Sequence, residues 1–215
     1  MLDKTLPYFN VIMKRRAGLP IAMHRLPSGF FIAGFVPGDE ISWACIETAV
    51  GEFATEDEAL TYFQTAYLPY SDELTRRCVF IRGADGGAVG TITSWWNWTE
   101  ERRHPSVHWL AVRPDYQGLG LGKALVSECL KRLMWLEGDR DIWLHTQTWS
   151  HRAIAIYLRA GFEFMRQDTF GGYPNDYEQA MPVLYKKLRA AAPQGLVSYQ
   201  CGLIAHEGDR TNDSD

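Results

Sequence analysis

The chain has 215 residues, of which 46% are hydrophobic and 13% aromatic, enough to build the core of one large domain or two small ones. Its formal net charge is −4, and Lys and Arg gather only in short pairs, so a nucleic-acid surface is not expected. The longest apolar runs are far shorter than the roughly 20 residues of a membrane helix, and the first ten residues lack the apolar segment of a signal peptide. Composition therefore predicts a globular, cytoplasmic protein.

The N-terminal half is expected to contain short strands and two helices. Alternation and turn residues predict strands over 9–13, 30–35, 79–82 and 88–95. Asp39 is expected to cap a helix over 40–50, and Thr55 with Glu58 forms a capping box for a helix over 56–67. Asp-Gly and Gly-Gly pairs between the last two strands are typical of a hairpin.

In the C-terminal half, strands are predicted over 107–112, 142–148 and 162–167. One helix opens at a glycine-rich turn and ends at Gly138, and a second runs from a cap at Ser150 to Ala160. Residues 177–188 show helical spacing, but Pro182 would remove a hydrogen bond inside such a helix, so helix and strand both stay open. The tail over 207–215 is too polar to pack and is expected to be disordered.

The four cysteines are scattered, without the spacing of a zinc site or a disulfide framework. The pattern predicts buried free thiols. Cys129, for example, falls on the apolar face of its predicted helix together with Leu125 and Leu133.

The glycine-rich turn is the most informative segment, because it stands between a predicted strand and an amphipathic helix. Gly118, Gly120 and Gly122 let the backbone approach a ligand closely, and the N–H groups at the helix start favour a phosphate or pyrophosphate. A P-loop is excluded because Ala124 cannot supply the hydroxyl that holds magnesium. A dinucleotide fingerprint would place Lys123 where a small residue is needed.

Two motifs in this region resemble those of the GNAT superfamily of acyl-CoA N-acyltransferases. Gln117, Gly120 and Gly122 match the pyrophosphate-binding pattern Gln/Arg-x-x-Gly-x-Gly/Ala. Downstream, Tyr157 precedes a Gly-Phe pair by four residues, as in the second signature of that family. The resemblance covers about residues 79–168, with one departure at Ser150, where many members have Asn.

The resemblance implies an α/β fold with a mixed, mostly antiparallel central sheet, flanking helices and a splayed central strand pair. One domain over 1–190 and a tail over 191–215 are expected. The implied function is transfer of an acetyl group from acetyl-CoA to a primary amine of a small molecule or peptide by direct attack. A catalytically silent acyl-CoA sensor is the alternative. No metal, nucleic acid or membrane is expected as a partner, and a homodimer is compatible with this interpretation.

The resemblance also assigns the coenzyme site. Backbone N–H groups over 117–123 would hold the pyrophosphate, with Lys123 adding a charge, and exposed amides over 110–112 would pair with the pantetheine arm and polarise the thioester. The predicted coenzyme-binding residues are Leu110, Ala111, Val112, Gln117, Gly118, Leu119, Gly120, Leu121, Gly122, Lys123 and Ser150.

For catalysis, His108 is the predicted base, placed by strand alternation on the face opposite Val107 and Trp109. His145 on the neighbouring strand is the rival. Tyr157 is the predicted general acid toward the departing thiolate, a step that is uphill by roughly 2 kcal/mol and therefore helpful rather than obligatory.

Two other groups of side chains have open roles. Glu47 and Glu52 can attract an amine, although exposed carboxylates on a helix surface are the more ordinary interpretation. Trp95, Trp96 and Trp98 form either an aromatic wall at the acceptor entrance or part of the core. The identity of the acceptor is not specified by the sequence.

Overall fold

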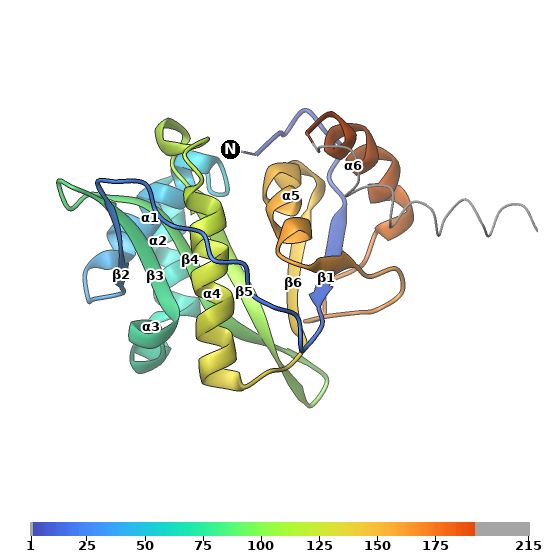
Figure 1. The fold of residues 1–215 in the computed structure, drawn as a ribbon, viewed down its shortest axis with the longest axis horizontal. Helices are drawn as coiled ribbons and strands as arrows, with labels where there is room; N and C mark the ends of the chain where they lie inside the picture. The colour runs from blue at the N-terminus through green and yellow to red at the C-terminus, as the bar shows by residue number, and fades with distance from the viewer. Residues whose placement is uncertain (1, 192–215) are drawn as a thin grey trace, which may run out of the picture.

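The computed structural model describes residues 2–191 and shows one twisted sheet with helices on both faces (Figure 1). The strands are β1 (Asn10–Arg15), β2 (Phe30–Gly34), β3 (Cys78–Gly83), β4 (Ala88–Thr99), β5 (Arg102–Val112), β6 (Ile142–Gln147) and β7 (Phe162–Phe164). Their order in space is β2-β3-β4-β5-β6-β1-β7, and all neighbours are antiparallel except β5 and β6. The predicted mixed, mostly antiparallel α/β fold is confirmed.

The helices are α1 (Asp39–Val50), α2 (Glu56–Ala66), α3 (Ser71–Arg77), α4 (Leu121–Glu137), α5 (His151–Arg159) and α6 (Tyr177–Ala191). Short 3-10 turns occupy Leu68–Tyr70, Pro114–Tyr116 and Thr148–Ser150. Residues 177–188, for which helix and strand were both left open, form part of helix α6, and Pro182 lies inside it. The expected tail over 191–215, with its disordered end, lies outside the described residues from position 192 onward. Among the helices of residues 2–191, none has the length and apolar character to cross a membrane.

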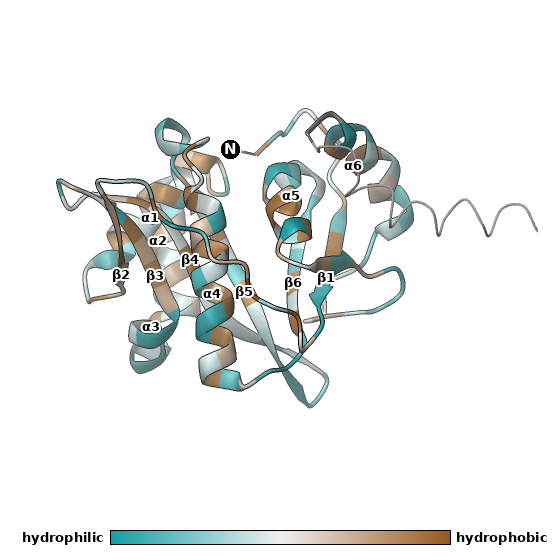
Figure 2. Ribbon diagram, in the orientation of Figure 1, coloured by the Kyte–Doolittle hydropathy of each residue, from teal (hydrophilic) through white to brown (hydrophobic). Residues whose placement is uncertain are grey.

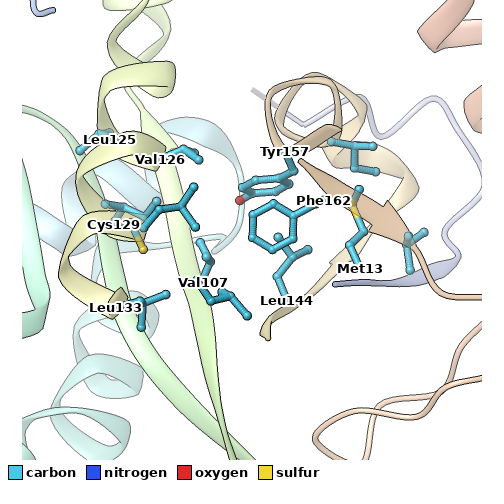
Figure 3. Close-up of a cluster of buried hydrophobic side chains, with 14 of the residues drawn as sticks. Met13, Val107, Leu125, Val126, Cys129, Leu133, Leu144, Tyr157 and Phe162 are labelled. Carbon is cyan, nitrogen blue, oxygen red and sulfur yellow. The ribbon is translucent and has the colours of Figure 1, made fainter. Parts of the chain in front are cut away.

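Two hydrophobic cores pack against opposite faces of the sheet. One core joins α4 and α5 to the sheet through buried side chains such as Leu125, Cys129 and Phe162, several of which appear in Figure 3. The other core lies under α1, α2 and α3, around Trp43 and Phe63. Figure 2 shows hydrophobic and hydrophilic residues alternating along α4 and α5, as expected for helices that pack one face on a sheet. Cys129 and Cys78 are buried free thiols as predicted, whereas Cys45 is only half-buried and Cys201 is outside the described residues.

Several local predictions need correction. Asp39 does not cap α1: Gly38 holds the cap position at φ 101°, and the Asp39 carboxylate instead accepts the Val36 N–H at 3.0 Å and pairs with Arg82 at 2.5 Å. Ser150 does not cap α5 with its side chain; its own N–H donates to Gln147 Oε1 at 2.9 Å. At the start of α1, the left-handed Gly38 stands where a side-chain cap was expected. Before α5, the side-chain amide of Gln147 accepts a backbone N–H in place of the expected Ser150 cap.

The strand boundaries also differ from those predicted. β5 begins at Arg102, because it pairs with β4 along a long hairpin rather than only at its buried end. β7 ends at Phe164, since its partner β1 pairs with it over only three residues. α3 was not predicted. By contrast, the capping box is confirmed, because Thr55 Oγ1 accepts the Glu58 N–H at 3.2 Å.

Candidate active site

The two central strands separate at the site. β5 and β6 are paired at a single position, Ser106 with Trp143, and the ribbons diverge beyond it toward α4 and α5 (Figure 1). The predicted splayed strand pair is confirmed. Because a backbone group without a strand partner must bond elsewhere or face a ligand, the edge of β5 over 107–112 becomes available for binding.

One cavity lies between the glycine turn, the end of β5 and α5, and we call it the glycine-turn cleft. Its volume is about 440 Å³. Of the predicted coenzyme residues, only Leu119 does not line it, and the Leu119 side chain is largely exposed. The lining residues from that prediction are Leu110, Ala111, Val112, Gln117, Gly118, Gly120, Leu121, Gly122, Lys123 and Ser150.

The glycine turn has the backbone geometry that its sequence suggests. Gly118 and Gly120 both have φ 83°, in the left-handed region that side chains disfavour, and Gly120 caps the 17-residue helix α4. A Cβ on Gly122 would lie 3.0 Å from Ile156 Cδ1 and would narrow the cleft between α4 and α5. The Gln117 side-chain amide donates to the Val112 carbonyl at 2.8 Å and ties the turn to β5. Free N–H groups of the first helical turn therefore face an open cleft.

The second cavity, of about 500 Å³, we call the histidine pocket. It is lined by His108, His145, Tyr157, Glu47 and Glu52, among others. Both cavities include Leu2, Glu52, Leu110, Ser150 and Ala153 in their walls. The two cavities therefore meet where β5 and α5 approach each other.

His108 lies in the histidine pocket, half-buried, with both ring nitrogens engaged. Nδ1 is 2.7 Å from the Tyr67 hydroxyl and Nε2 is 2.8 Å from Ser106 Oγ. Both hydroxyls belong to buried residues, and burial lowers the pKa of His108 to about 3. The ring is therefore neutral at pH 7, and a proton from the pocket would reach it through one of these hydroxyls.

The side-chain alternation expected along β5 fails at Trp109. Its φ is 52°, and the pairing with β4 shifts by one residue between Thr91 and Thr93, which is a β-bulge. Trp109 consequently packs on Trp43 with ring centroids 5.3 Å apart, on the same side of the sheet as His108. Left-handed backbone at a bulky residue costs about 1–3 kcal/mol, which the aromatic contacts offset.

His145 lies on β6 and has a different environment. Its Nε2 is 2.9 Å from Asn10 Oδ1, and its ring stacks on Tyr173 with centroids 3.8 Å apart. Burial lowers its pKa to about 4, while the carboxylate of Asp176 acts in the opposite direction. This ring too is neutral at pH 7.

The prediction that Glu47 is an exposed helix-surface carboxylate is wrong. Glu47 is 1% exposed, and within residues 2–191 its Oε1 has no hydrogen-bond partner. Burial, reinforced by the nearby charge of Glu52, raises the pKa of Glu47 well above its usual value. Burial also raises the pKa of half-buried Glu52, although Lys4 opposes this. Helix α1 packs its Glu47 side against the sheet, a consequence of tertiary packing that the charge pattern did not reveal.

Tyr157 projects from α5 into the core beside the pocket. It packs edge-on against Phe162, and Figure 3 shows its hydroxyl oxygen directed toward the side chains of α4. In the part of the chain that the structure describes, this hydroxyl makes no hydrogen bond, and burial raises its pKa. The hydroxyl is therefore protonated at neutral pH and has a proton to donate.

The three tryptophans at the end of β4 line neither cavity. Trp95 is buried in the second core and stacks on Trp96 at 4.2 Å, while Trp98 is largely exposed. Sequence reasoning missed Asn10 and Tyr173 beside His145, because neither belongs to a motif. Across residues 2–191, no three His, Cys, Asp or Glu side chains gather as a possible metal site.

Comparison with known proteins decides the family. Residues 42–162 match the model of the acetyltransferase (GNAT) family. The chain belongs to this family. The resemblance of its two motifs is thus confirmed, and the glycine-turn cleft is formed by the first of them.

Individual relatives agree with this assignment. The mycothiol acetyltransferase of Streptomyces coelicolor is 32% identical over 149 residues, which are 67% of this chain and 46% of that protein. The mycothiol acetyltransferase of Pseudarthrobacter chlorophenolicus is 32% identical over 162 residues, or 73% of this chain and 49% of that protein. The chain thus spans about half the length of the curated relatives it matches.

Among solved structures, the GCN5-related N-acetyltransferase from Sphaerobacter thermophilus superposes with a TM-score of 0.55 at 23% identity. The match covers 74% of this chain and 49% of that chain. This likeness supports the fold.

Proposed function

We propose that this protein transfers an acetyl group from acetyl-CoA to a primary amine. The observation that carries the proposal is the meeting of two chemically different cavities at Leu110. One cavity offers backbone N–H groups at a helix N-terminus, and the other contains the buried carboxyl group of Glu47 and two half-buried histidines. The curated relatives are named as acetyltransferases, which agrees with this chemistry.

In this proposal the glycine-turn cleft holds the donor. The pyrophosphate binds N–H groups from Gly118 to Gly122, where the dipole of α4 contributes roughly half a positive charge, and Lys123 adds a full one. The pantetheine arm runs along the free edge of β5 toward Leu110. The residues of the cleft fit this group, since Gly118, Gly120 and Gly122 line it without side chains.

The histidine pocket holds the acceptor. Its volume of about 500 Å³ suits a small molecule or the end of a peptide. A buried carboxylate without a partner is unfavourable, so Glu47 favours a ligand that brings a positive charge and hydrogen-bond donors. An ammonium group supplies both.

Transfer then requires three changes of bonding. A base removes a proton from the ammonium, the free amine attacks the thioester carbon, and the carbon–sulfur bond breaks as the new carbon–nitrogen bond forms. The departing thiolate takes a proton from Tyr157 or from water, and the second proton that the nitrogen loses as the amide forms replaces it. Two histidines of the pocket are candidates for the base: His108, the predicted one, which would act through Ser106 or Tyr67 because both its ring nitrogens are bonded, and its rival His145.

A screen of amines with detection of free thiol tests the proposal. The protein and acetyl-CoA are incubated with each amine, and the acetylated product is identified by mass spectrometry. Thiol release that depends on an amine supports transfer. Stabilisation of the protein by acetyl-CoA, without turnover of any amine, would support the silent-sensor alternative instead. A cytoplasmic location and a homodimer remain predictions.

A further inference from the structure

A chain of three hydrogen-bonded side chains ends at His145. Asp176, which precedes α6, accepts a hydrogen bond from the side-chain amide of Asn10 at 2.9 Å. The other end of that amide is 2.9 Å from His145 Nε2. Asn10 lies on β1 and His145 on β6, where the two strands are paired, so the chain connects α6 to the histidine pocket across the sheet.

These hydrogen bonds determine the orientation of the Asn10 side-chain amide. Asp176 Oδ2 also accepts the backbone N–H of Asn10 at 2.8 Å. An ionised carboxylate accepts hydrogen bonds only, so the amide NH₂ of Asn10 must face Asp176 and its Oδ1 must face His145. The Tyr8 hydroxyl, 3.4 Å from the same Oδ1, is consistent with this orientation.

The amide orientation in turn determines the tautomer of His145. An amide oxygen accepts only, so His145 Nε2 must carry the ring proton and Nδ1 must carry the lone pair. In the part of the chain that the structure describes, Nδ1 makes no hydrogen bond. His108 differs, because each of its nitrogens is already bonded to a buried hydroxyl.

The ring of His145 is also held in place by stacking. Tyr173 lies parallel to it, with an interplanar angle of 2°. The titratable groups that line the histidine pocket together with His145 are Lys4, Tyr8, Glu47, Glu52, Tyr62, His108, Tyr157 and Tyr173, and Asp176 acts on His145 from outside the pocket lining. Asp176 is the carboxylate that favours the protonated ring, while burial keeps the ring neutral before a proton arrives.

We propose that His145 Nδ1 accepts the proton of the acceptor amine, and that Asn10 and Asp176 are positioning residues that fix its tautomer. This inference rests on the proposed function. The N–H bond of the ammonium breaks, a bond forms between that proton and Nδ1, and the imidazolium continues to donate its Nε2–H to Asn10 Oδ1. Asp176 stabilises the positive charge through the amide.

The test combines kinetics with nuclear magnetic resonance of the imidazole nitrogens. His145→Gln should lower kcat/KM for the amine by roughly 10²- to 10⁴-fold, with acetyl-CoA affinity little changed. In the wild-type protein, His145 should show the tautomer with a proton on Nε2. Asn10→Ala should mix the two tautomers and lower kcat about tenfold, with a smaller effect on KM.

Asp176→Asn provides a second readout. It keeps an acceptor for the Asn10 amide but removes the negative charge, so the acidic limb of the pH profile of kcat/KM should move to lower pH. His151→Ala serves as the matched control, because His151 is paired with Asp3 and does not line the histidine pocket. Its profile should match that of the wild type.

Two results would overturn the inference. One is a proton on Nδ1 of His145 in the wild-type protein. The other is an unchanged kcat/KM in His145→Gln, combined with loss of the acidic limb of the pH profile in His108→Ala. That result would assign the base to His108. If no amine is acetylated by the wild type, the proposed function fails instead, and the tautomer measurement still decides whether Asn10 orients the ring.

Discussion

Replacing the buried carboxylate of Glu47 by an amide should have opposite effects on acceptor binding and on stability. The side chain is 1% exposed, and Oε1 has no partner within residues 2–191. If Glu47 holds the ammonium of the acceptor, Glu47→Gln loses a charge-assisted hydrogen bond worth about 1.5–3 kcal/mol. This corresponds to a rise in KM for the amine of roughly 10- to 150-fold. KM for acetyl-CoA should change little.

The same substitution should stabilise the ligand-free protein at higher pH. The pKa of Glu47 is raised on folding, so between the unfolded and folded pKa values the folded state holds more protons than the unfolded state. The stability contributed by the protonated carboxyl is therefore complete at acid pH and is lost as pH rises through the folded pKa. Glu47→Gln is neutral throughout and should lose this dependence.

The expected size follows from the cost of ionising a buried carboxyl, since the amide keeps the same oxygen but stays neutral. A buried unsatisfied group costs about 1–3 kcal/mol and more when it is charged, so the amide is favoured by at least about this amount where Glu47 is ionised. For a domain of this size 1 kcal/mol shifts Tm by about 2–4 °C. Thermal unfolding of wild type and Glu47→Gln from acid to alkaline pH measures the difference, which should grow with pH. Glu101→Gln, in the exposed β4–β5 turn, is the control and should show neither effect. An unchanged amine KM, or a lower Tm at every pH, would refute the role given to Glu47.

Three further variants test other parts of the site. Gly122→Val places a side chain against Ile156, so acetyl-CoA affinity measured by calorimetry should fall by roughly 100-fold or more, and normal binding would refute the coenzyme site. His108→Ala should lower turnover about tenfold if the ring only orders Ser106 and Tyr67. A fall of 10²-fold or more, together with loss of the acidic limb of the pH–rate profile, would make His108 the base. Tyr157→Phe should slow turnover roughly tenfold, and the loss should be smaller with an acyl donor whose thiol leaves more easily. If the rate is unchanged when the chemical step is rate-limiting, Tyr157 has only a packing role in the core.

The fold was largely predictable because its signals are local. The glycine turn and the apolar face of α4, with Leu125 and Cys129, were read directly from spacing, and the capping box at Thr55 fixed the start of α2. The helix over 71–77 was missed, although Asp72 and Glu73 in its first turn and two arginines in its last complement the helix dipole. Its short length left no apolar periodicity to detect.

The coenzyme side of the site was predictable for the same reason, whereas the acceptor side was not. The burial of Glu47 depends on how α1 packs. The direction of the Trp109 side chain depends on the β-bulge opposite Thr91 and Thr93. The contact between Asn10 and Asp176 joins residues 166 positions apart. Such long-range contacts follow from the topology of the sheet and have no local sequence pattern.

The central claim is that acetyl-CoA and an amine meet at the junction of the two cavities near Leu110. The most direct measurement is the release of free thiol from acetyl-CoA by the full chain across a panel of primary amines, with the product identified by mass spectrometry. The account predicts thiol release that requires an amine and yields one acetyl-amide per thiol, and it predicts that Gly122→Val abolishes this release. Binding of acetyl-CoA with no amine-dependent thiol release across the panel would contradict it.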